Sequence, residues 1–200
     1  MPYLVTASEA LFEHFCALHG IPCSRIAECA SSTPDYLVRV SGLDLIVEIK
    51  QIDKDENFSN ARSSRAVGDH VRAKISEAKK QLQPAARQGT PAIMLIYNNL
   101  DPLQAFGTEQ HDFVAAMYGE PTVLLSLETG KIVDSFEGKN KSFHVNKNTS
   151  FSAVGQLKRS EHGPLVHLYE NIYAKIPLDY GRLPVAVTYT KFRAEANGDA

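Results

Sequence analysis

The sequence predicts an α/β fold in which helices flank a central mixed β-sheet as a three-layer sandwich. The chain alternates stretches of helical spacing with short apolar runs, and residues 43–49 and 92–97 are apolar at almost every position. Strands of that kind are buried on both faces, as in a sheet with helices on either side. The apolar runs are also far too short to cross a bilayer.

Three segments carry the pattern of helices. We expect a first helix over about 9–19 with Ser8 as its N-cap, because apolar residues recur at helical spacing and Gly20 with Pro22 provides a stop. A second, long and mostly polar helix is expected over 66–86, and a third around 109–118.

The expected strands fall between and after these helices. Two of them, 36–40 and 43–49, are close enough in sequence to form a hairpin around Ser41 and Gly42. The polar segment after the second strand is typical of a loop. The remaining expected elements are a loop over 52–64, strands at 92–97, 151–157 and 165–169, and a hairpin of 122–127 with 131–136.

Length and composition limit the class of protein. The 200 residues, 44% of them hydrophobic, fit one domain over 1–192, with a flexible tail expected over 193–200. A net charge of −2 excludes a wholly basic nucleic-acid binder but allows a local basic patch. Three cysteines at spacings that match no zinc module indicate buried, reduced thiols. Without a signal-peptide pattern, we expect a cytoplasmic protein that does not enter the membrane.

The segment that carries chemistry runs from Pro34 to Lys50. Pro-Asp opens one expected strand at Asp35, and Glu48-Ile49-Lys50 closes the next. The Glu-x-Lys triplet alone is weak, because the chain has three of them, at Glu48, Glu77 and Glu137, and chance gives about one. Only the triplet at Glu48 has a Pro-Asp pair on a preceding strand.

The spacing of these residues has a geometric consequence. Side chains two apart on a strand leave the same face, so Glu48 and Lys50 point together while Ile49 points to the opposite layer. The hairpin brings Asp35 close to them. Two carboxylates without an accompanying Cys or His suit Mg²⁺ or Mn²⁺ and disfavour zinc. Such a metal with a lysine beside it suits phosphodiester hydrolysis.

A less specific interpretation stays open. An acidic pair with a lysine at a strand end also occurs as a solvated cluster of ion pairs. Charged groups that end a buried strand at the edge of a sheet, however, lie where active sites of α/β folds gather. The chain shows no Gly-x-Ser-x-Gly nucleophile motif and no Gly-rich phosphate loop, so other hydrolase classes have less support.

The run TPDYLVRVSGLDLIVEIKQ resembles the core of the PD-(D/E)XK nuclease superfamily, over roughly residues 9–97. The first helix is similar to that of archaeal Holliday-junction resolvases, and the second half resembles an uncharacterised bacterial branch. The resemblance implies a restriction-endonuclease-like fold. It implies that Asp35 and Glu48 bind Mg²⁺ or Mn²⁺ and that Lys50 is the catalytic lysine, and it implies DNA as the substrate.

The same resemblance assigns further residues to the site. Glu9 on the first helix matches best as an additional acid, with Glu13 one turn later as the reserve. Gln51, which follows the motif directly, is the further catalytic residue, and Gln81 on the next helix, where several branches carry a glutamine, is expected to bind nucleic acid. For both amides, an ordinary surface or helix-face role is an equal alternative.

Basic residues cluster in two segments. Residues 62–87 carry a local excess of positive charge, and 139–160 contain five basic residues and no acid. Such segments contact phosphate backbones, although solvated helix faces carry similar charge. Because the second helix begins soon after the catalytic motif, we expect Arg72, Lys74 and Lys79 to contact phosphates beside the scissile one.

Two functional hypotheses therefore accompany this fold. The first is a Mg²⁺- or Mn²⁺-dependent endo- or exonuclease acting on nucleic acid, most simply DNA. The second is a catalytically inactive nuclease-like fold that binds nucleic acid or a partner protein. A homodimer is compatible with either hypothesis, and the sequence does not choose between DNA and RNA.

Overall fold

The computed structural model describes most of the chain, and structural statements refer to that part. The described residues are 5–27, 32–53, 66–100, 102–125, 129, 132–137 and 139–192. The tail expected over 193–200 and nearly all of the loop expected over 52–64 fall outside them.

The elements follow one another in an α/β order. The helices are α1 (Ala7–Leu18), α2 (Asp69–Arg87), α3 (Gln110–Tyr118) and a short 3-10 helix, η1 (Tyr180–Arg182). The strands are β1 (Cys23–Arg25), β2 (Tyr36–Val40), β3 (Leu43–Ile52), β4 (Ala92–Asn98), β5 (Pro121–Leu125), β6 (Ile132–Glu137), β7 (Ala153–Ser160), β8 (Gly163–Glu170) and β9 (Val187–Thr190).

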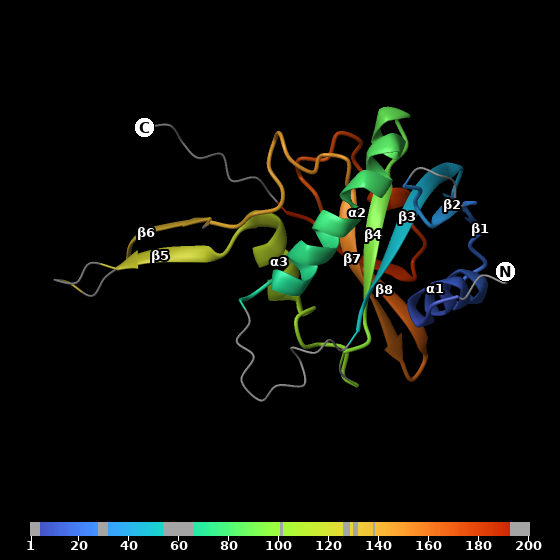
Figure 1. Ribbon diagram of the computed structural model, residues 1–200, viewed down its shortest axis with the longest axis horizontal. Coiled ribbons are helices and arrows are strands. Elements are labelled where there is room, and N and C mark those ends of the chain that lie inside the picture. The colour runs from blue at the N-terminus through green and yellow to red at the C-terminus, as the bar shows by residue number, and fades with distance from the viewer. Residues whose placement is uncertain are drawn as a thin grey trace.

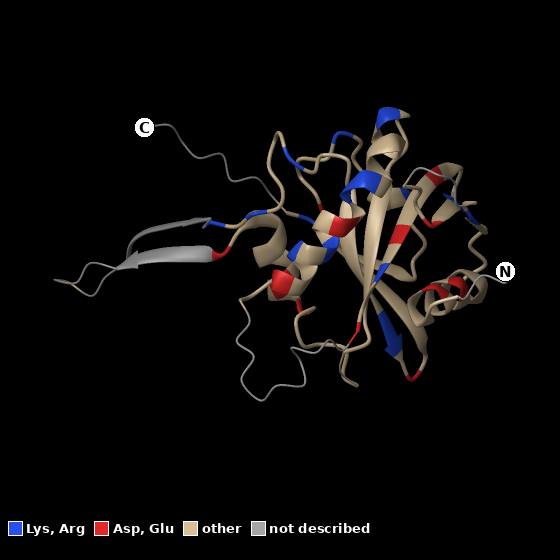
Figure 2. Ribbon diagram, in the orientation of Figure 1, with Lys and Arg blue, Asp and Glu red and all other residues tan. Residues whose placement is uncertain are grey.

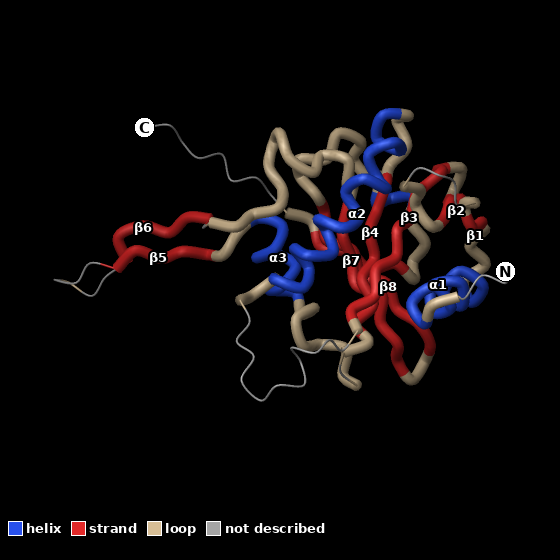
Figure 3. The backbone as a smooth tube through the Cα atoms, viewed as in Figure 1, coloured by secondary structure: helices blue, strands red, loops and turns tan. Residues whose placement is uncertain are grey.

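Seven of these strands form one mixed sheet in the order β1-β2-β3-β4-β7-β8-β9. β1, β2 and β3 are antiparallel neighbours, β3, β4 and β7 run parallel, β8 is antiparallel to β7, and β9 is parallel to β8. The carboxyl ends of β3, β4 and β7 therefore meet at one edge, where ligands gather in α/β sheets. β5 and β6 form a separate antiparallel hairpin that projects from the body (Figure 3).

Helices cover both faces of the large sheet, as Figure 1 shows. Phe12 and Phe15 of α1 pack with Val47 of β3 and Leu95 of β4 in one core. Residues of α2 and α3, among them Ile75, pack on the opposite face in a second core. The predicted α/β class, the mixed sheet and the helices on both sides are thus confirmed.

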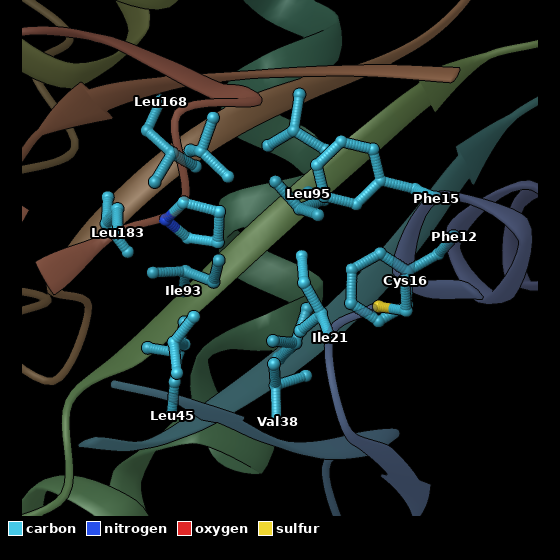
Figure 4. A pocket seen from close by; sticks show the side chains of 15 residues that line it. Phe12, Phe15, Cys16, Ile21, Val38, Leu45, Ile93, Leu95, Leu168 and Leu183 are labelled. Atoms are coloured by element: carbon cyan, nitrogen blue, oxygen red, sulfur yellow. The ribbon is translucent and has the colours of Figure 1, made fainter. Parts of the chain in front are cut away.

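The core beneath α1 contains a small gap. Figure 4 shows Phe12, Phe15 and Cys16 reaching from the helix toward Ile93 and Leu95 on the sheet. Together with other apolar side chains they line a cavity of about 30 Å³. An apolar cavity of that size stays dry and offers no polar partner for a ligand, so it belongs to packing and not to a functional site. Cys16 and Cys23 carry free thiols, and the predicted Cys29 thiol lies outside the described residues.

Local sequence explains the first helix, with one correction. The N-cap is Thr6, not Ser8: Thr6 accepts from the backbone N–H of Glu9, and Glu9 reaches back to the Thr6 N–H. This capping box satisfies two free N–H groups at the helix start, whereas Ser8 lies inside the helix.

The second helix begins three residues later than expected. α2 starts at Asp69 because Gly68 takes a left-handed backbone conformation, with φ of 77°. A Cβ at Gly68 would lie 2.8 Å from backbone atoms of Asp112 and Ala116 in α3, so this contact requires glycine. The glycine therefore fixes how closely α2 approaches α3.

Several strand boundaries also differ from the prediction: the strands expected at 151–157 and 165–169 are Ala153–Ser160 and Gly163–Glu170. Residue 52 belongs to β3, not to a loop, because Lys50, Gln51 and Ile52 pair with Ile96, Tyr97 and Asn98 of β4. Lys50 and Gln51 are polar, so the apolar pattern that predicts β3 ends before the strand does. β1 and β9 were not predicted, since three or four residues are too few to show a period. No helix in the described part is long and apolar enough to span a membrane.

Candidate metal and active site

The β2–β3 hairpin places Asp35 opposite Glu48. Tyr36 pairs with Val47, and both side chains belong to the core under α1. One step further along the ladder, Asp35 and Glu48 therefore face the α2 side of the sheet. Asp35 Oδ2 accepts a hydrogen bond from the Ile49 N–H at 2.7 Å, which fixes this carboxylate beside β3. The predicted antiparallel pairing of the two strands is confirmed.

Glu48 is buried with only part of its charge matched. Its side chain is 1% exposed, and Oε1 lies 2.7 Å from Lys50 Nζ. The other oxygen, Oε2, is buried and makes no hydrogen bond of normal geometry with the described residues. A buried carboxylate oxygen without a donor costs free energy unless a ligand satisfies it, so this atom marks a candidate site.

The pKa values of both carboxyl groups reflect this environment. Burial first, and then the negative charge of Asp35, raises the pKa of Glu48 to about 7, although Lys50 and the Asp35 backbone N–H oppose the rise. Burial also raises the pKa of Asp35, against the lowering effect of the Ile49 N–H and of Lys50. The pair therefore stabilises a bound proton or cation between its members.

Lys50 links this pair to α2. Its ammonium lies between Glu48 and Gln81, donating to Gln81 Oε1 at 3.3 Å. The alternation along β3 puts Glu48 and Lys50 on the same face, as expected from their spacing. Gln81 thus reaches the site, and its role as an orienting amide for Lys50 was not part of the sequence prediction.

The start of α1 brings further acids to the neighbourhood. Glu9 accepts from Arg25 Nη1 at 2.6 Å, and Glu13 accepts from Arg25 Nη2 at 2.9 Å and from the Tyr36 hydroxyl at 2.8 Å. Glu9 is near enough to raise the pKa of Asp35, and Arg25 lowers it. Of the two predicted alternatives, Glu9 therefore has the closer electrostatic connection to Asp35.

Arg25 was missed by sequence analysis. It lies on β1, whose three residues give no periodic signal, and it opposes Tyr36 across the sheet. Its guanidinium pairs with both Glu9 and Glu13, so its single positive charge partly compensates the acids near Asp35.

Gln51 faces away from Lys50, toward α1. Its Oε1 accepts from the Ser8 N–H at 2.9 Å, and its Nε2 donates to Asp53 Oδ1 at 2.7 Å. Asp53 also accepts from Asn99 Nδ2, at 2.8 Å. Gln51 thus fastens the start of α1 to the carboxyl end of β3, and a catalytic role for it stays a prediction.

The predicted phosphate-binding residues of α2 differ in environment. Arg72 is 15% exposed and donates to Asp69 Oδ1 at 2.7 Å, to the Val67 carbonyl at 2.5 Å and to the Ala115 carbonyl at 3.3 Å. Lys74 pairs with Glu77 at 3.0 Å, and Lys79 is exposed. Figure 2 shows both signs of charge along the helix. Arg72 thus contributes to α2–α3 packing, and nucleic-acid binding by these residues stays a prediction.

A second group of potential metal ligands lies at the start of α3. One ligand atom from each of Glu109, His111 and Asp112 falls within 4.8 Å of the others. Asp112 is already used by the fold, since it accepts from the backbone N–H groups of Gly68 and Glu109. This group is non-specific, since exposed acidic groups are common without a bound ion, and it identifies no metal.

Comparison with known proteins adds no family to this geometry. No protein-family model matches the chain, no curated protein matches it significantly, and no solved structure does so.

Proposed function

We propose that the protein is a metal-dependent nuclease of the PD-(D/E)XK type that hydrolyses phosphodiester bonds in DNA. The observation that carries this proposal is the buried Glu48 carboxylate, whose Oε2 lacks a hydrogen-bond partner among the described residues while a second carboxylate, Asp35, lies beside it. A solvated ion-pair cluster would be exposed and fully matched, and Glu48 is neither.

The residues present fit a hard divalent cation. Asp35 and Glu48 supply carboxylate oxygens from two adjacent strands, and neither cysteine nor histidine takes part in this pair, so Mg²⁺ or Mn²⁺ is the expected ion. Bound there, such an ion supplies Lewis-acid polarisation of the phosphodiester and acidification of water. Cation binding would also relieve the repulsion between the buried Glu48 carboxylate and the half-buried Asp35 carboxylate beside it.

Lys50 is positioned to act on the substrate beside the proposed metal. Its ammonium is held by Glu48 on one side and by Gln81 on the other. When a cation binds the Glu48 carboxylate and weakens its ion pair with Lys50, the hydrogen bond to Gln81 still holds the Lys50 ammonium in place. A fixed positive group beside the scissile phosphate orients water and stabilises the charge that develops on phosphorus.

The outer residues support this centre. Glu9 is the proposed additional acid at the start of α1, and Gln51 holds α1 against β3. The order α1, β1, β2, β3, α2, β4 agrees with a restriction-endonuclease-like core in which a helix precedes the catalytic hairpin. Lys74 and Lys79 of α2 are proposed to contact phosphates outside the reacting one.

The test is cleavage of a panel of substrates by the purified protein. Single-stranded, duplex and branched DNA, and RNA of matched sequence, are incubated with Mg²⁺ or Mn²⁺, beside reactions in EDTA. We expect metal-dependent cleavage of DNA by the wild type and none by Asp35→Asn, which keeps the shape of the side chain. Equal cleavage by wild type and Asp35→Asn would overturn the proposal.

A binding module without catalysis is the second candidate, and one observation favours it. Arg25 pairs with Glu9 and Glu13, and Lys50 pairs with Glu48, so two positive charges stand against the four carboxylates without a metal. This candidate predicts tight nucleic-acid binding that is unchanged by EDTA, with no cleavage of any substrate in the panel.

A further inference from the structure

Two cysteine side chains meet where the end of α1 lies beside β1, as the two elements do in Figure 1. On β1, Cys23 precedes Arg25 by two residues, so both side chains leave the face of the strand that packs on the core under α1. Arg25 Nη2 donates to Glu13 Oε1 of the helix at 2.9 Å. Cys16 follows Glu13 by three residues and therefore lies one turn later on the same side of α1, next to Cys23.

The contacts of this cysteine pair hold its two sulfur atoms side by side. The thiols are hydrogen-bonded to each other, and the Ile21 N–H donates to the Cys16 carbonyl at 2.8 Å, which fixes the short turn between α1 and β1. Cys16 is 3% exposed, whereas Cys23 is half-buried at the rim of the same core. A disulfide needs a sulfur–sulfur distance of about 2 Å, which hydrogen-bonded sulfurs reach by a small side-chain movement.

The surroundings give the two sulfur atoms different reactivity. The hydrogen bond from Cys16 lowers the pKa of the Cys23 thiol, and the charge of Arg25 acts in the same direction, although burial and Glu13 oppose them. The same hydrogen bond, together with burial, raises the pKa of the Cys16 thiol. The thiolate is the form of cysteine that reacts with peroxides, and it must be accessible to them. Cys23 therefore suits the attacking sulfur, and Cys16 suits the thiol that completes the bond.

A metal site is the other use that two neighbouring thiols could have. Structural zinc is held by four protein ligands, usually cysteine and histidine. Among the described residues, no third cysteine, histidine or carboxylate ligand atom lies within 4.8 Å of both of these sulfurs. The pair therefore fits a bond between its own members better than a shared cation.

We propose that Cys16 and Cys23 form a reversible disulfide bond that fastens the end of α1 to β1 when the protein meets a hydroperoxide. The Cys23 thiolate attacks one peroxide oxygen, the O–O bond breaks, and the products are a sulfenic acid and, after protonation of the leaving oxygen, water. The Cys16 sulfur then attacks the Cys23 sulfur, the S–O bond breaks, and the hydroxyl group leaves with the thiol proton as a second water. The two sulfurs lose two electrons and the peroxide gains them.

The bond would act at a junction that the fold already uses. Arg25 of β1 pairs with Glu9 and Glu13 of α1, and the disulfide would join the same helix to the same strand covalently. It closes a loop over residues 17–22, which restricts the unfolded chain and stabilises the folded one. A dithiol reductant reverses the reaction. This inference does not rest on the proposed nuclease function.

The test is treatment of the reduced, purified protein with an equimolar amount of hydrogen peroxide. Remaining thiols are then alkylated, intact mass spectrometry measures the product, and peptide mapping identifies the cysteines that are joined. Dimedone, which reacts with sulfenic acids, is present in a parallel sample. The variants are Cys16→Ser and Cys23→Ser, and the matched control is Cys29→Ser, which removes the third cysteine of the chain. Thermal unfolding of the oxidised and the reduced protein measures the effect of the bond on stability.

We expect the wild type and Cys29→Ser to lose the mass of two hydrogen atoms and to regain it with dithiothreitol, with the peptides of Cys16 and Cys23 joined. Cys16→Ser should carry a dimedone adduct on Cys23, and Cys23→Ser should react with peroxide about tenfold more slowly. The oxidised wild type should unfold about 5 °C above the reduced protein.

Two results would overturn the assignment of the cysteine pair. The first is a wild type that forms no disulfide under these conditions, and the second is a bond that uses Cys29 instead of Cys16 or Cys23. A thermal midpoint that falls on oxidation would contradict the fastening of α1 to β1, because it would show that the bond distorts this junction.

Discussion

Two Glu-x-Lys triplets of this chain have the same residue types and opposite environments. On β3, Glu48 and Lys50 leave the same face and lie 2.7 Å apart, and Glu48 is 1% exposed. On α2, Glu77 is exposed and pairs with Lys74, three residues earlier, instead of Lys79, two residues later. Residues two apart share a face on a strand but not on a helix.

The comparison shows what distinguishes a candidate site from a solvated charge cluster. On α2, Arg72 pairs with Asp69 and Lys74 with Glu77 in the same helix, and Arg72 also holds α2 against α3. The Glu48 carboxylate is buried and lies near Asp35. Its Oε2 has no hydrogen bond among the described residues. Unmatched buried charge is costly, so a bound proton or cation would compensate it.

The largest difference between the two triplets is expected when Glu48 and Glu77 are each replaced by glutamine, in separate variants. Glu48→Gln removes the proposed metal ligand and should lower the cleavage rate by about a thousandfold, because metal stabilisation of the transition state is worth several kcal/mol. Glu77→Gln carries the same chemical change on an exposed helix and should cleave within about twofold of the wild type. Single-turnover cleavage of a labelled DNA measures both, and similar losses in the two variants would remove the distinction.

Lys50→Ala should lower the cleavage rate by about a hundredfold or more while both carboxylates remain. The reason is that the ammonium held by Gln81 and Glu48 is lost without change in the ligand set. Lys80→Ala, an exposed lysine of α2 to which no role in the site is assigned, is the control. Metal affinity, measured by calorimetry, should change much less in Lys50→Ala than in Glu48→Gln. If the metal affinity falls equally in Lys50→Ala and Glu48→Gln, Lys50 acts in metal binding and not in the reaction.

The pH dependence of stability should differ between Glu48 and its neutral variant. The pKa of Glu48 is about 7 in the folded protein and 4.5 in its ordinary state, so the folded state keeps a proton that the unfolded chain has lost between these values. Stability of the wild type therefore falls as pH rises from about 4.5 to 7, by about 3 kcal/mol for this group.

Glu48→Gln cannot lose that proton and should be more stable than the wild type at pH 8, with the advantage disappearing near pH 4.5. Urea unfolding in EDTA at both pH values measures the difference, and Glu77→Gln provides the exposed control. An equal slope of stability against pH in wild type and Glu48→Gln would mean that Glu48 is not held in the environment described here.

A smaller effect is expected where charge serves the fold. Arg72→Ala should lower the free energy of unfolding by about 1–3 kcal/mol, since it removes the hydrogen bonds that the guanidinium donates to the Val67 and Ala115 carbonyls and to Asp69 Oδ1. Lys79→Ala, on the exposed side of the same helix, should change it by less than about 0.5 kcal/mol. The denaturant midpoints of the two variants measure this difference. Equal midpoints in Arg72→Ala and Lys79→Ala would show that Arg72 does not stabilise the fold.

The sequence predicted the parts of this molecule whose signal is local. Apolar runs identified β3 and β4, and the spacing of Asp35, Glu48 and Lys50 predicted that they would share one face of a hairpin. β1 was too short to detect, and with it Arg25, whose contacts with Glu9 and Glu13 arise only when α1 folds over the sheet. The loop contact between Gln104 and Arg159 spans 55 residues and has no counterpart in sequence spacing.

Calorimetric titration of the metal-free protein with Mg²⁺ and Mn²⁺ tests the proposed metal site most directly. We expect one site in the wild type and in Glu77→Gln, and at least a tenfold loss of affinity in Glu48→Gln, because buried Glu48 and half-buried Asp35 are the proposed ligands. Equal affinity in wild type and Glu48→Gln would contradict the assignment of Glu48 as a metal ligand and, with it, the proposed mechanism.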